Sequence, residues 1–210
     1  WHVAQRRRRP EQDVVRQLGD MFAKDALGHP AVKVVDLMIE YVIFGTGFCQ
    51  KKKPQSTKLA VKGVSFGVKK GECFGLLGTN GAGKTSTFKV LSGEIVPNHG
   101  QALIAGLNVE SDMKKIGALI GYCPQFDALL ENLTAREHLE LYAAIKGIPY
   151  AMREKLVQNK LRQLNLKPYE NVLAGTYSGG NKRKLSVAIA LLGNPPIILL
   201  DEPSSGMDPE

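Results

Sequence analysis

The sequence is poor in cysteine and contains no long apolar run. Its three cysteines, Cys49, Cys73 and Cys123, are widely spaced and form no C-x-x-C pair. An odd, scattered set predicts reduced thiols in a cytosolic setting and argues against a disulfide framework. No apolar run approaches the ~18–20 residues that a membrane-spanning helix needs. Residues 1–10 are basic with no apolar stretch behind them, so we expect no signal peptide there.

Metal-ligand patterns are absent from the sequence as well. The four histidines show no ligand spacing, and we interpret all of them as surface or incidental residues. They are His2, His29, His99 and His138. With 210 residues, of which 43% are hydrophobic, the chain is long enough to bury the core of one domain.

Positive charge is in excess and unevenly distributed. Lys and Arg number 28 against 20 Asp and Glu, which gives a net charge of +8. Runs at Arg6–Arg9 and Lys51–Lys53 are compatible with a solvated tail and loop. The alternative for Arg6–Arg9 is contact with anionic lipid headgroups close to a membrane. No basic groove interleaved with aromatics is visible, so we expect no nucleic-acid partner.

A phosphate-binding loop is the most informative motif present. Residues 78–85 read GTNGAGKT, which matches G-x-x-x-x-G-K-[ST] in full. The apolar run Cys73–Leu77 predicts a strand before the loop, and Thr85–Leu91 predicts a helix after it. A strand, a loop and a helix in this order are the context that such a loop requires.

Each residue type in this loop has a physical role. Glycines 78, 81 and 83 permit backbone angles that let successive N–H groups converge on phosphate oxygens, at the positive end of the helix that follows. Lys84 is placed to reach the β- and γ-phosphates, and the Thr85 hydroxyl to join the shell of a Mg²⁺ ion. The predicted nucleotide-binding residues are Gly78, Thr79, Asn80, Gly81, Ala82, Gly83, Lys84, Thr85 and Ser86.

A second motif is an apolar run that ends in two acids. Ile197–Leu200 precedes Asp201 and Glu202, which is the Walker B pattern. Continuous apolar runs are typical of parallel strands buried on both faces, and ligands bind at the carboxyl ends of such strands. Asp201 is therefore predicted to bind Mg²⁺. Glu202 is predicted to orient and deprotonate the attacking water.

Further motifs stand in the remaining chain. Residues 177–181 read YSGGN before a helical stretch at Lys182–Leu192, with Ser178 as a plausible N-cap. Gln125 lies in the string YCPQFD after the strand-like Leu119–Tyr122, and Ser205–Asp208 follows the Walker B acids. In this order the motifs resemble those of the nucleotide-binding domain of ABC transporters, over about residues 34–210.

The exact residues of the motifs narrow the resemblance to one subfamily. GECFGLLG, GYCPQFDAL, YSGGNKRKLS and LDEPSSGMDP look most like subfamily A, the lipid-exporting full transporters, and most like their second nucleotide-binding domain. Asn181 stands where many family members carry Gln. The chain stops directly after the D-loop motif, so we expect a fragment that lacks the family's switch histidine and its final strands.

The resemblance implies roles that the residues alone do not supply. Two such domains form a head-to-tail sandwich, in which Ser178, Gly179 and Gly180 would contact the γ-phosphate bound by the other copy. Gln125 would be a catalytic residue and metal ligand that links the attacking water to the transmembrane domains. Asp208 would lie in the D-loop at the dimer interface. Tyr41 would stack on adenine; the alternative is an ordinary aromatic at a strand end, because the connection that follows it is long.

The expected fold is an α/β P-loop NTPase (RecA-like) core with a mostly parallel central sheet, an N-terminal antiparallel β subdomain and an α-helical insertion. Residues 1–30 would be a basic polar linker and residues 31–210 the ATP-binding domain, with a helical subdomain at about 126–180. Strands are predicted at 34–39, 59–66, 101–105, 119–122 and 197–200. A capping box at Thr134–Glu137 predicts a helix to about Lys146, and apolar spacing predicts another over Ala151–Leu164.

The predicted function is ATP binding and hydrolysis that powers export, of lipid by the resemblance, at the cytoplasmic face of a membrane. Predicted catalytic residues are Lys84, Gln125 and Glu202, and predicted metal ligands are Thr85, Gln125 and Asp201. One alternative is a soluble ABC-type ATPase that acts on ribosomes or nucleic acid. Another is a nucleotide-gated binding module without hydrolysis, against which the presence of both Lys84 and Glu202 argues.

Overall fold

The computed structural model describes residues 30–44 and 54–203, which divide into two compact units. The first unit ends at Ile116 and the second begins at Gly117. Several sequence predictions fall outside the described residues: the linker over 1–29, Arg6–Arg9, His2, His29, Cys49, Lys51–Lys53 and Ser205–Asp208. The two cysteines that the structure does describe, Cys73 and Cys123, are both free thiols.

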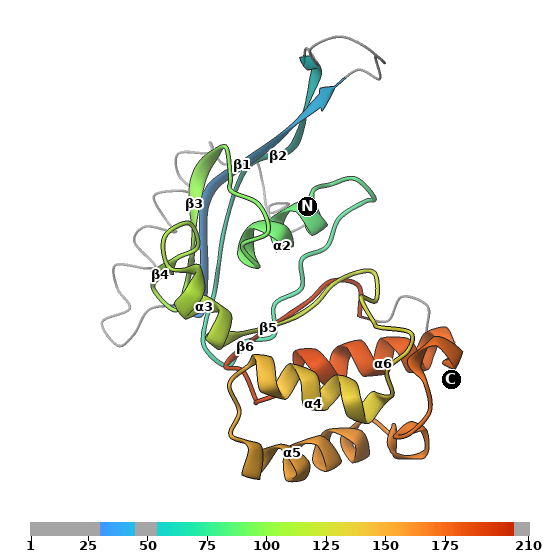
Figure 1. The fold of residues 1–210 in the computed structure, drawn as a ribbon. Coiled ribbons are helices and arrows are strands. Elements are labelled where there is room, and N and C mark those ends of the chain that lie inside the picture. The colour runs from blue at the N-terminus through green and yellow to red at the C-terminus, as the bar shows by residue number, and fades with distance from the viewer. Residues whose placement is uncertain (1–29, 45–53, 204–210) are drawn as a thin grey trace. The chain divides into compact units, whose positions relative to one another are not determined.

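The first unit is built on an antiparallel sheet with the strand order β2-β1-β3-β4 (Figure 1). Its strands are β1 (Val32–Phe44), β2 (Pro54–Val68), β3 (His99–Ile104) and β4 (Leu107–Asn108). The strands predicted at 34–39, 59–66 and 101–105 fall on β1, β2 and β3 and are confirmed. Both β1 and β2 run further than predicted, which shortens the connection between them.

A bulge in β1 keeps its apolar side chains on one face. Val32 and Val34 are buried, and after an irregularity in the pairing with β2 the buried positions continue at Leu37 and Ile39. Side chains alternate between the two faces of a strand, so this change from even to odd positions needs one extra residue. Asp36 lies in that stretch with a φ of 47°. The bulge explains why buried and exposed residues do not alternate strictly along β1.

Helix α2 (Lys84–Leu91) packs against this sheet through contacts with β2 and β3. Thr87, Val90 and Leu91 of this helix are buried. The helix predicted over 85–91 is confirmed. The predicted strand over Cys73–Leu77 is wrong, since residues 72–79 form no regular element. The ring of Phe74 instead stacks on Phe66 of β2, with centroids 5.1 Å apart. The segment thus contacts β2 through the ring of Phe74 and not through the hydrogen bonds of a strand.

A parallel strand pair forms the base of the second unit. After helix α3 (Met113–Leu119), strand β5 (Ile120–Cys123) pairs in parallel with β6 (Ile197–Leu200). Helix α6 (Gly179–Ala190) contacts β5. The strands predicted at 119–122 and 197–200 are confirmed. Because Cys123 pairs with Leu200, the segments that follow both strands begin at the same edge.

Helices complete the second unit. They are α4 (Ala135–Ile145), α5 (Tyr150–Gln163) and two short 3₁₀ helices, η1 (Lys167–Tyr169) and η2 (Ala174–Thr176). The capping box at Thr134 and Glu137 is present at the start of α4, as predicted. A core of fully buried side chains joins α4, α5 and α6: Leu139, Ala143, Val157, Leu161, Leu166, Leu185, Ala188 and Leu192. Within 30–44 and 54–203, no helix is both long and apolar enough to cross a membrane.

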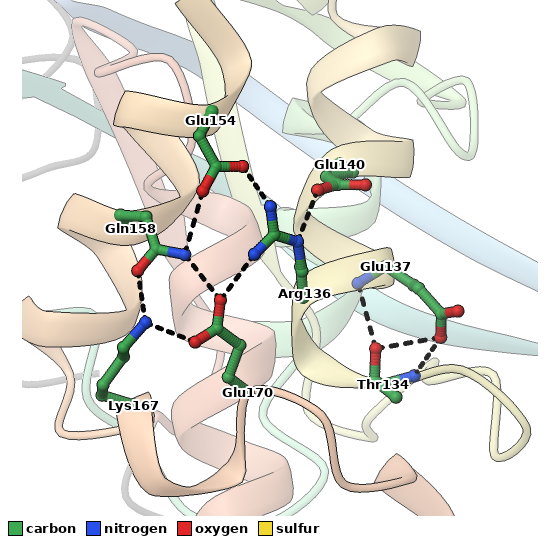
Figure 2. A network of polar contacts seen from close by, with 8 residues as sticks. All are labelled: Thr134, Arg136, Glu137, Glu140, Glu154, Gln158, Lys167 and Glu170. Atoms are coloured by element: carbon green, nitrogen blue, oxygen red, sulfur yellow. Dashed lines mark hydrogen bonds and ion pairs between the residues drawn. The ribbon is translucent and has the colours of Figure 1, made fainter.

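A polar network ties the outer sides of α4, α5 and η1 together (Figure 2). The Arg136 guanidinium donates to Glu140 at 2.9 Å, to Glu170 at 2.9 Å and to Glu154. Glu170 also accepts from Lys167 and Gln158, and these donors, Lys167 foremost, hold the pKa of its carboxyl below the usual range against the opposing effect of burial. The network fixes these elements in addition to the apolar core.

Candidate nucleotide-binding site

The phosphate loop of the first unit has the backbone conformation that the sequence predicts for two of its three glycines. Gly81 has a φ of 81° and Gly83 a φ of 90°, whereas Gly78 is not among the residues with a positive φ. At Gly83 a Cβ would lie 2.5 Å from the carbonyl oxygen of Ala60 and 2.7 Å from Val61 on β2. Only glycine satisfies both the conformation and the close approach to β2.

The start of α2 is open to an anion. Gly83 is the N-cap of α2 and provides no side-chain cap, and no acidic residue lies in the first turn. The first N–H groups of a helix lack partners within the helix and carry partial positive charge, which favours phosphate. Lys84 adds its ammonium here, which donates to the carbonyl oxygens of Gly78 at 2.8 Å and Thr79 at 3.2 Å. The lysine therefore bends back over the loop.

Tyr41 lies next to the phosphate loop in the same unit. Its hydroxyl donates to the Ser86 hydroxyl at 3.1 Å, which links β1 to the first turn of α2. The residue is 37% exposed, so part of it is accessible to a ligand. Thr85, the predicted metal ligand, is the residue before Ser86 and is half-buried. The structure thus brings Tyr41 and the predicted loop residues together.

The predicted acids lie together in the second unit, after β6. Asp201 is 1% exposed, and its N–H donates to the Cys123 carbonyl at 2.9 Å, which extends the pairing of β5 and β6. Its Oδ2 is buried without a hydrogen-bond partner in the described part of the chain. A buried carboxylate oxygen without a donor is costly, and a cation or its bound water would satisfy it.

Glu202 and Gln125 are in direct contact. The Gln125 amide donates to Glu202 Oε2 at 3.0 Å, from the segments after β5 and β6. The backbone of Glu202 has a φ of 49°, in the left-handed region. A side-chain-bearing residue held there costs about 1–3 kcal/mol, so surrounding contacts must fix it. Two residues that the sequence predicted separately as catalytic, Gln125 and Glu202, thus lie in direct contact.

Arg183 supplies those contacts, although no motif in the sequence marks it as a site residue. Its side chain, on α6, is 1% exposed. It donates to backbone carbonyls of the segments after β5 and β6 and to one carboxylate. These acceptors are the carbonyls of Pro124, Gln125, Asp201 (2.6 Å), Glu202 (2.9 Å) and Pro203 (3.2 Å), and Asp127 Oδ1 (3.2 Å). In the string NKRK, neighbouring lysines make this arginine look like one more surface charge.

The signature segment opens α6, as predicted. Ser178 is the N-cap, and its hydroxyl accepts from the Asn181 N–H at 3.4 Å. Gly179 and Gly180 form the first turn of the helix, and a Cβ at Gly180 would meet open space. Ser178 and Gly179 are exposed. The helix start is accessible, without acidic residues in its first turn.

The prediction that all four histidines are surface or incidental is wrong for His138. This residue of α4 is fully buried, and its Nε2 accepts from the Leu130 N–H at 2.9 Å. Its Nδ1 lies 2.8 Å from the Thr134 carbonyl oxygen, which can only accept, so Nδ1 carries the proton. His138 therefore fixes residues 130–134 ahead of α4. His99 is exposed as predicted and lies 3.2 Å from Asp36.

The predicted site residues fall into two groups. Tyr41 and the phosphate loop belong to the first unit, whereas Gln125, the Walker B acids and the signature segment belong to the second. A phosphate loop that opens a helix, together with a buried acid after a parallel strand, defines the class of P-loop nucleotide-binding domains. The sequence model of the ABC transporter family matches residues 61–205, so the chain belongs to this family.

Individual relatives are similar over most of the chain. It is 48% identical to the phospholipid-transporting ATPase ABCA3 of Rattus norvegicus, over 90% of the chain and 11% of that protein. It is 53% identical to the retinal-specific phospholipid-transporting ATPase ABCA4 of Homo sapiens, over 75% of the chain and 7% of that protein. The chain therefore spans a small fraction of the length of the curated relatives it matches.

Solved structures share the fold. An ATP-binding subunit of an ABC transporter matches with a TM-score of 0.69 and 31% identity, over 85% of this chain and 69% of that one. The ATP-binding cassette MJ0796, in a dimeric post-hydrolysis state bound to ADP and Pi, matches with a TM-score of 0.72 and 26% identity, over 84% and 76%. These similarities establish the P-loop NTPase fold.

Proposed function

We propose that the chain is a nucleotide-binding domain, the second of two, in an ABC subfamily A transporter, and that it binds and hydrolyses ATP to drive lipid export. The observation that carries the proposal is the contact of Gln125 with Glu202 beside the buried Asp201. This arrangement offers a base for water and an acid for a metal. The names of the relatives, both phospholipid-transporting ATPases, support lipid as the substrate class.

ATP binding would rest on the phosphate loop. The N–H groups at the start of α2 and the ammonium of Lys84 would receive the β- and γ-phosphates, for which Lys84 would exchange its bonds to Gly78 and Thr79. Tyr41 would stack on adenine, since it lies beside Ser86 and is partly exposed. If Tyr41 were instead an ordinary aromatic at a strand end, its loss would not weaken recognition of the base.

Mg²⁺ would be held by Thr85, Gln125 and Asp201. The unpartnered Oδ2 of Asp201 fits this donor set, because hard cations prefer carboxylate, hydroxyl and amide oxygens. No group of three or more His, Cys, Asp or Glu side chains in 30–44 and 54–203 could hold a metal by itself. Phosphate oxygens and water would supply the remaining ligands, and the bound ion would neutralise charge on the phosphates.

Hydrolysis would use Glu202 as the general base. Its Oε2 accepts from Gln125, a contact that would orient the carboxylate and would leave the amide beside the attacking water. Both residues stand at the carboxyl ends of parallel strands, where ligands bind in open α/β sheets.

A second nucleotide-binding domain would complete the site. Ser178, Gly179 and Gly180 would contact the γ-phosphate held by that domain in a head-to-tail sandwich, and the open start of α6 is suited to this role. The solved cassette MJ0796 is dimeric, which supports such pairing. Further partners would be the transmembrane domains at the cytoplasmic face of a membrane. Contact of Arg6–Arg9 with anionic headgroups remains a proposal for residues outside the described part.

Glu202→Gln in the complete transporter tests the proposal. General bases accelerate reactions by about 10²–10⁴-fold, so we expect the rate of phosphate release to decrease by a factor in this range. Binding of Mg·ATP should persist, because the phosphate loop is unchanged. Glu131→Gln, an exposed glutamate of the same unit, is the matched control and should hydrolyse ATP normally. Full turnover by Glu202→Gln would contradict the proposed role.

The two alternatives predict different results. A soluble ATPase that acts on ribosomes or nucleic acid would be stimulated by them and would lack membrane domains in its complete sequence; neither relative is named as such. A binding module without hydrolysis would release no phosphate in the wild type.

A further inference from the structure

Arg183 is a buried cation that the proposed reaction does not use. Its side chain is 1% exposed, while Asp127, its one carboxylate partner among the described residues, has a side chain that is 22% exposed. Burying a guanidinium is costly unless its donors are matched by acceptors. Nearly all of its acceptors are backbone carbonyls. These bonds order the main chain, but a carbonyl does not neutralise the charge of the guanidinium. The arrangement fixes the main chain at a considerable desolvation cost.

The main chain that Arg183 fixes belongs to the two residues whose side chains meet. It donates to the carbonyls of Gln125 and Glu202, and the Gln125 amide in turn donates to Glu202 Oε2. A planar guanidinium directs its donors in a rigid fork, so it can hold two segments in one register. A lysine has a single flexible head and cannot reproduce the fork.

The backbone of Glu202 makes this register demanding. Its φ of 49° is unfavourable for a residue with a side chain, and Arg183 bonds the carbonyls of Asp201, Glu202 and Pro203 around it. Without these bonds the peptide would relax towards an ordinary conformation. That rotation would swing the Glu202 carboxylate away from Gln125.

Arg183 also belongs to α6, which begins at the signature segment. Ser178 caps the helix and Arg183 lies in its second turn, so the two move together. We propose that Arg183 is a positioning residue for ATP hydrolysis: it sets the arrangement of Gln125 and Glu202 according to the position of α6. The inference rests on the proposed function. It adds a link between the segment that meets the partner domain's nucleotide and the general base.

The test is Arg183→Lys in the complete transporter. Positive charge is kept and the fork is lost, so kcat should fall about tenfold or more. The Kd for metal-free ATP should stay within about twofold, since Lys84 and Tyr41, which are proposed to bind its phosphates and base, are not among the groups to which Arg183 donates in the described residues. The matched control is Lys184→Arg, the reverse exchange at the next position of α6, which should keep kcat within about twofold. A wild-type kcat in Arg183→Lys would overturn the inference.

A double-mutant cycle separates positioning from general stability. If Arg183 acts through Gln125, Arg183→Lys should lower kcat by less than about twofold in a Gln125→Ala background, where the contact is already gone. Equal losses in both backgrounds, or a Kd that rises as kcat falls, would mean a structural role alone and would overturn the inference.

A milder variant tests the inference even if Arg183→Lys does not fold. Asp127→Asn leaves all carbonyl partners in place and removes only the partly exposed carboxylate. We expect kcat to fall about two- to fivefold with Kd unchanged. If Arg183→Lys does not fold, a wild-type kcat in Asp127→Asn overturns the inference. The absence of ATP hydrolysis in the wild-type transporter would instead overturn the proposed function.

Discussion

At the scale of single residues, the structure distinguishes buried polar side chains whose polar atoms are all paired from those that keep an unpaired polar atom. His138 is buried with both ring nitrogens engaged, so it behaves as part of the fold. Asp201 is equally buried, yet one of its carboxylate oxygens has no partner in the described residues. Tyr41 lies between these cases, with one hydrogen bond and a partly exposed ring.

Tyr41 gives the first prediction at this scale. If its ring stacks on adenine, Tyr41→Ala should raise the Kd for ATP about tenfold, as loss of one base–aromatic contact does. Tyr41→Phe keeps the ring but loses the bond to Ser86, and should bind ATP within about twofold of the wild type. Titration calorimetry measures both. Equal losses of affinity for ATP and tripolyphosphate in Tyr41→Ala would show that the ring does not contact the base.

At the scale of elements, α4, α5 and η1 are joined by charge as well as by an apolar core. Glu170 is the centre of this network, because it accepts from Arg136, Gln158 and Lys167 (Figure 2). Glu170 is only 8% exposed, so the loss of its charge weakens three charge-assisted hydrogen bonds, which are stronger than those to a neutral acceptor.

Glu170→Gln should therefore lower the free energy of unfolding by about 1–3 kcal/mol at neutral pH. The pKa of Glu170 is lowered in the folded state, foremost by Lys167, so its contribution is present above the ordinary glutamate pKa. That contribution is lost as the pH falls through the lower folded-state pKa. Denaturant unfolding from pH 7 to about pH 3 should thus show a shallower pH dependence in Glu170→Gln. Glu131→Gln, which is exposed, should unfold like the wild type; identical pH profiles for Glu170→Gln and wild type would refute the assignment.

At the scale of the whole molecule, the proposed sandwich requires that ATP itself joins two nucleotide-binding domains. Ser178, Gly179 and Gly180 would contact a γ-phosphate bound by the other domain, so the contact should last only while that phosphate is present.

In the complete transporter carrying Glu202→Gln, Mg·ATP should hold the two nucleotide-binding domains together. Spectroscopic labels, one on each domain, should approach when ATP is added and stay close. Adding Lys84→Ala, which removes the ammonium at the phosphate loop, should abolish the approach. Labels that come together equally well with ADP would argue against recognition of the γ-phosphate by the signature segment.

The sequence predicted most elements and the loop chemistry, because those depend on local pattern. The phosphate loop, the capping box at Thr134 and the apolar run before Asp201 each require only neighbouring residues. The failures concern partners distant in sequence. The run Cys73–Leu77 has the composition of a strand, but composition does not reveal whether a ladder partner is available. His138 and Arg183 look like surface residues until the neighbours that bury them are known.

The long ribbon of β1 and β2 has a consequence for handling the protein in solution. Strand β1 pairs with β3 only from Val32 to Met38, while its pairing with β2 continues to Phe44 (Figure 1). Val42 and Ile43, in the part beyond β3, are 48% and 46% exposed. Apolar strand edges of this kind recruit further copies of a chain into aggregates, and lysines on the partner strand, such as Lys58 opposite Tyr41, oppose that growth by charge repulsion. Colloidal stability of the purified chain therefore depends on keeping these lysines charged, which favours neutral or mildly acidic buffers of low ionic strength over alkaline or concentrated salt solutions.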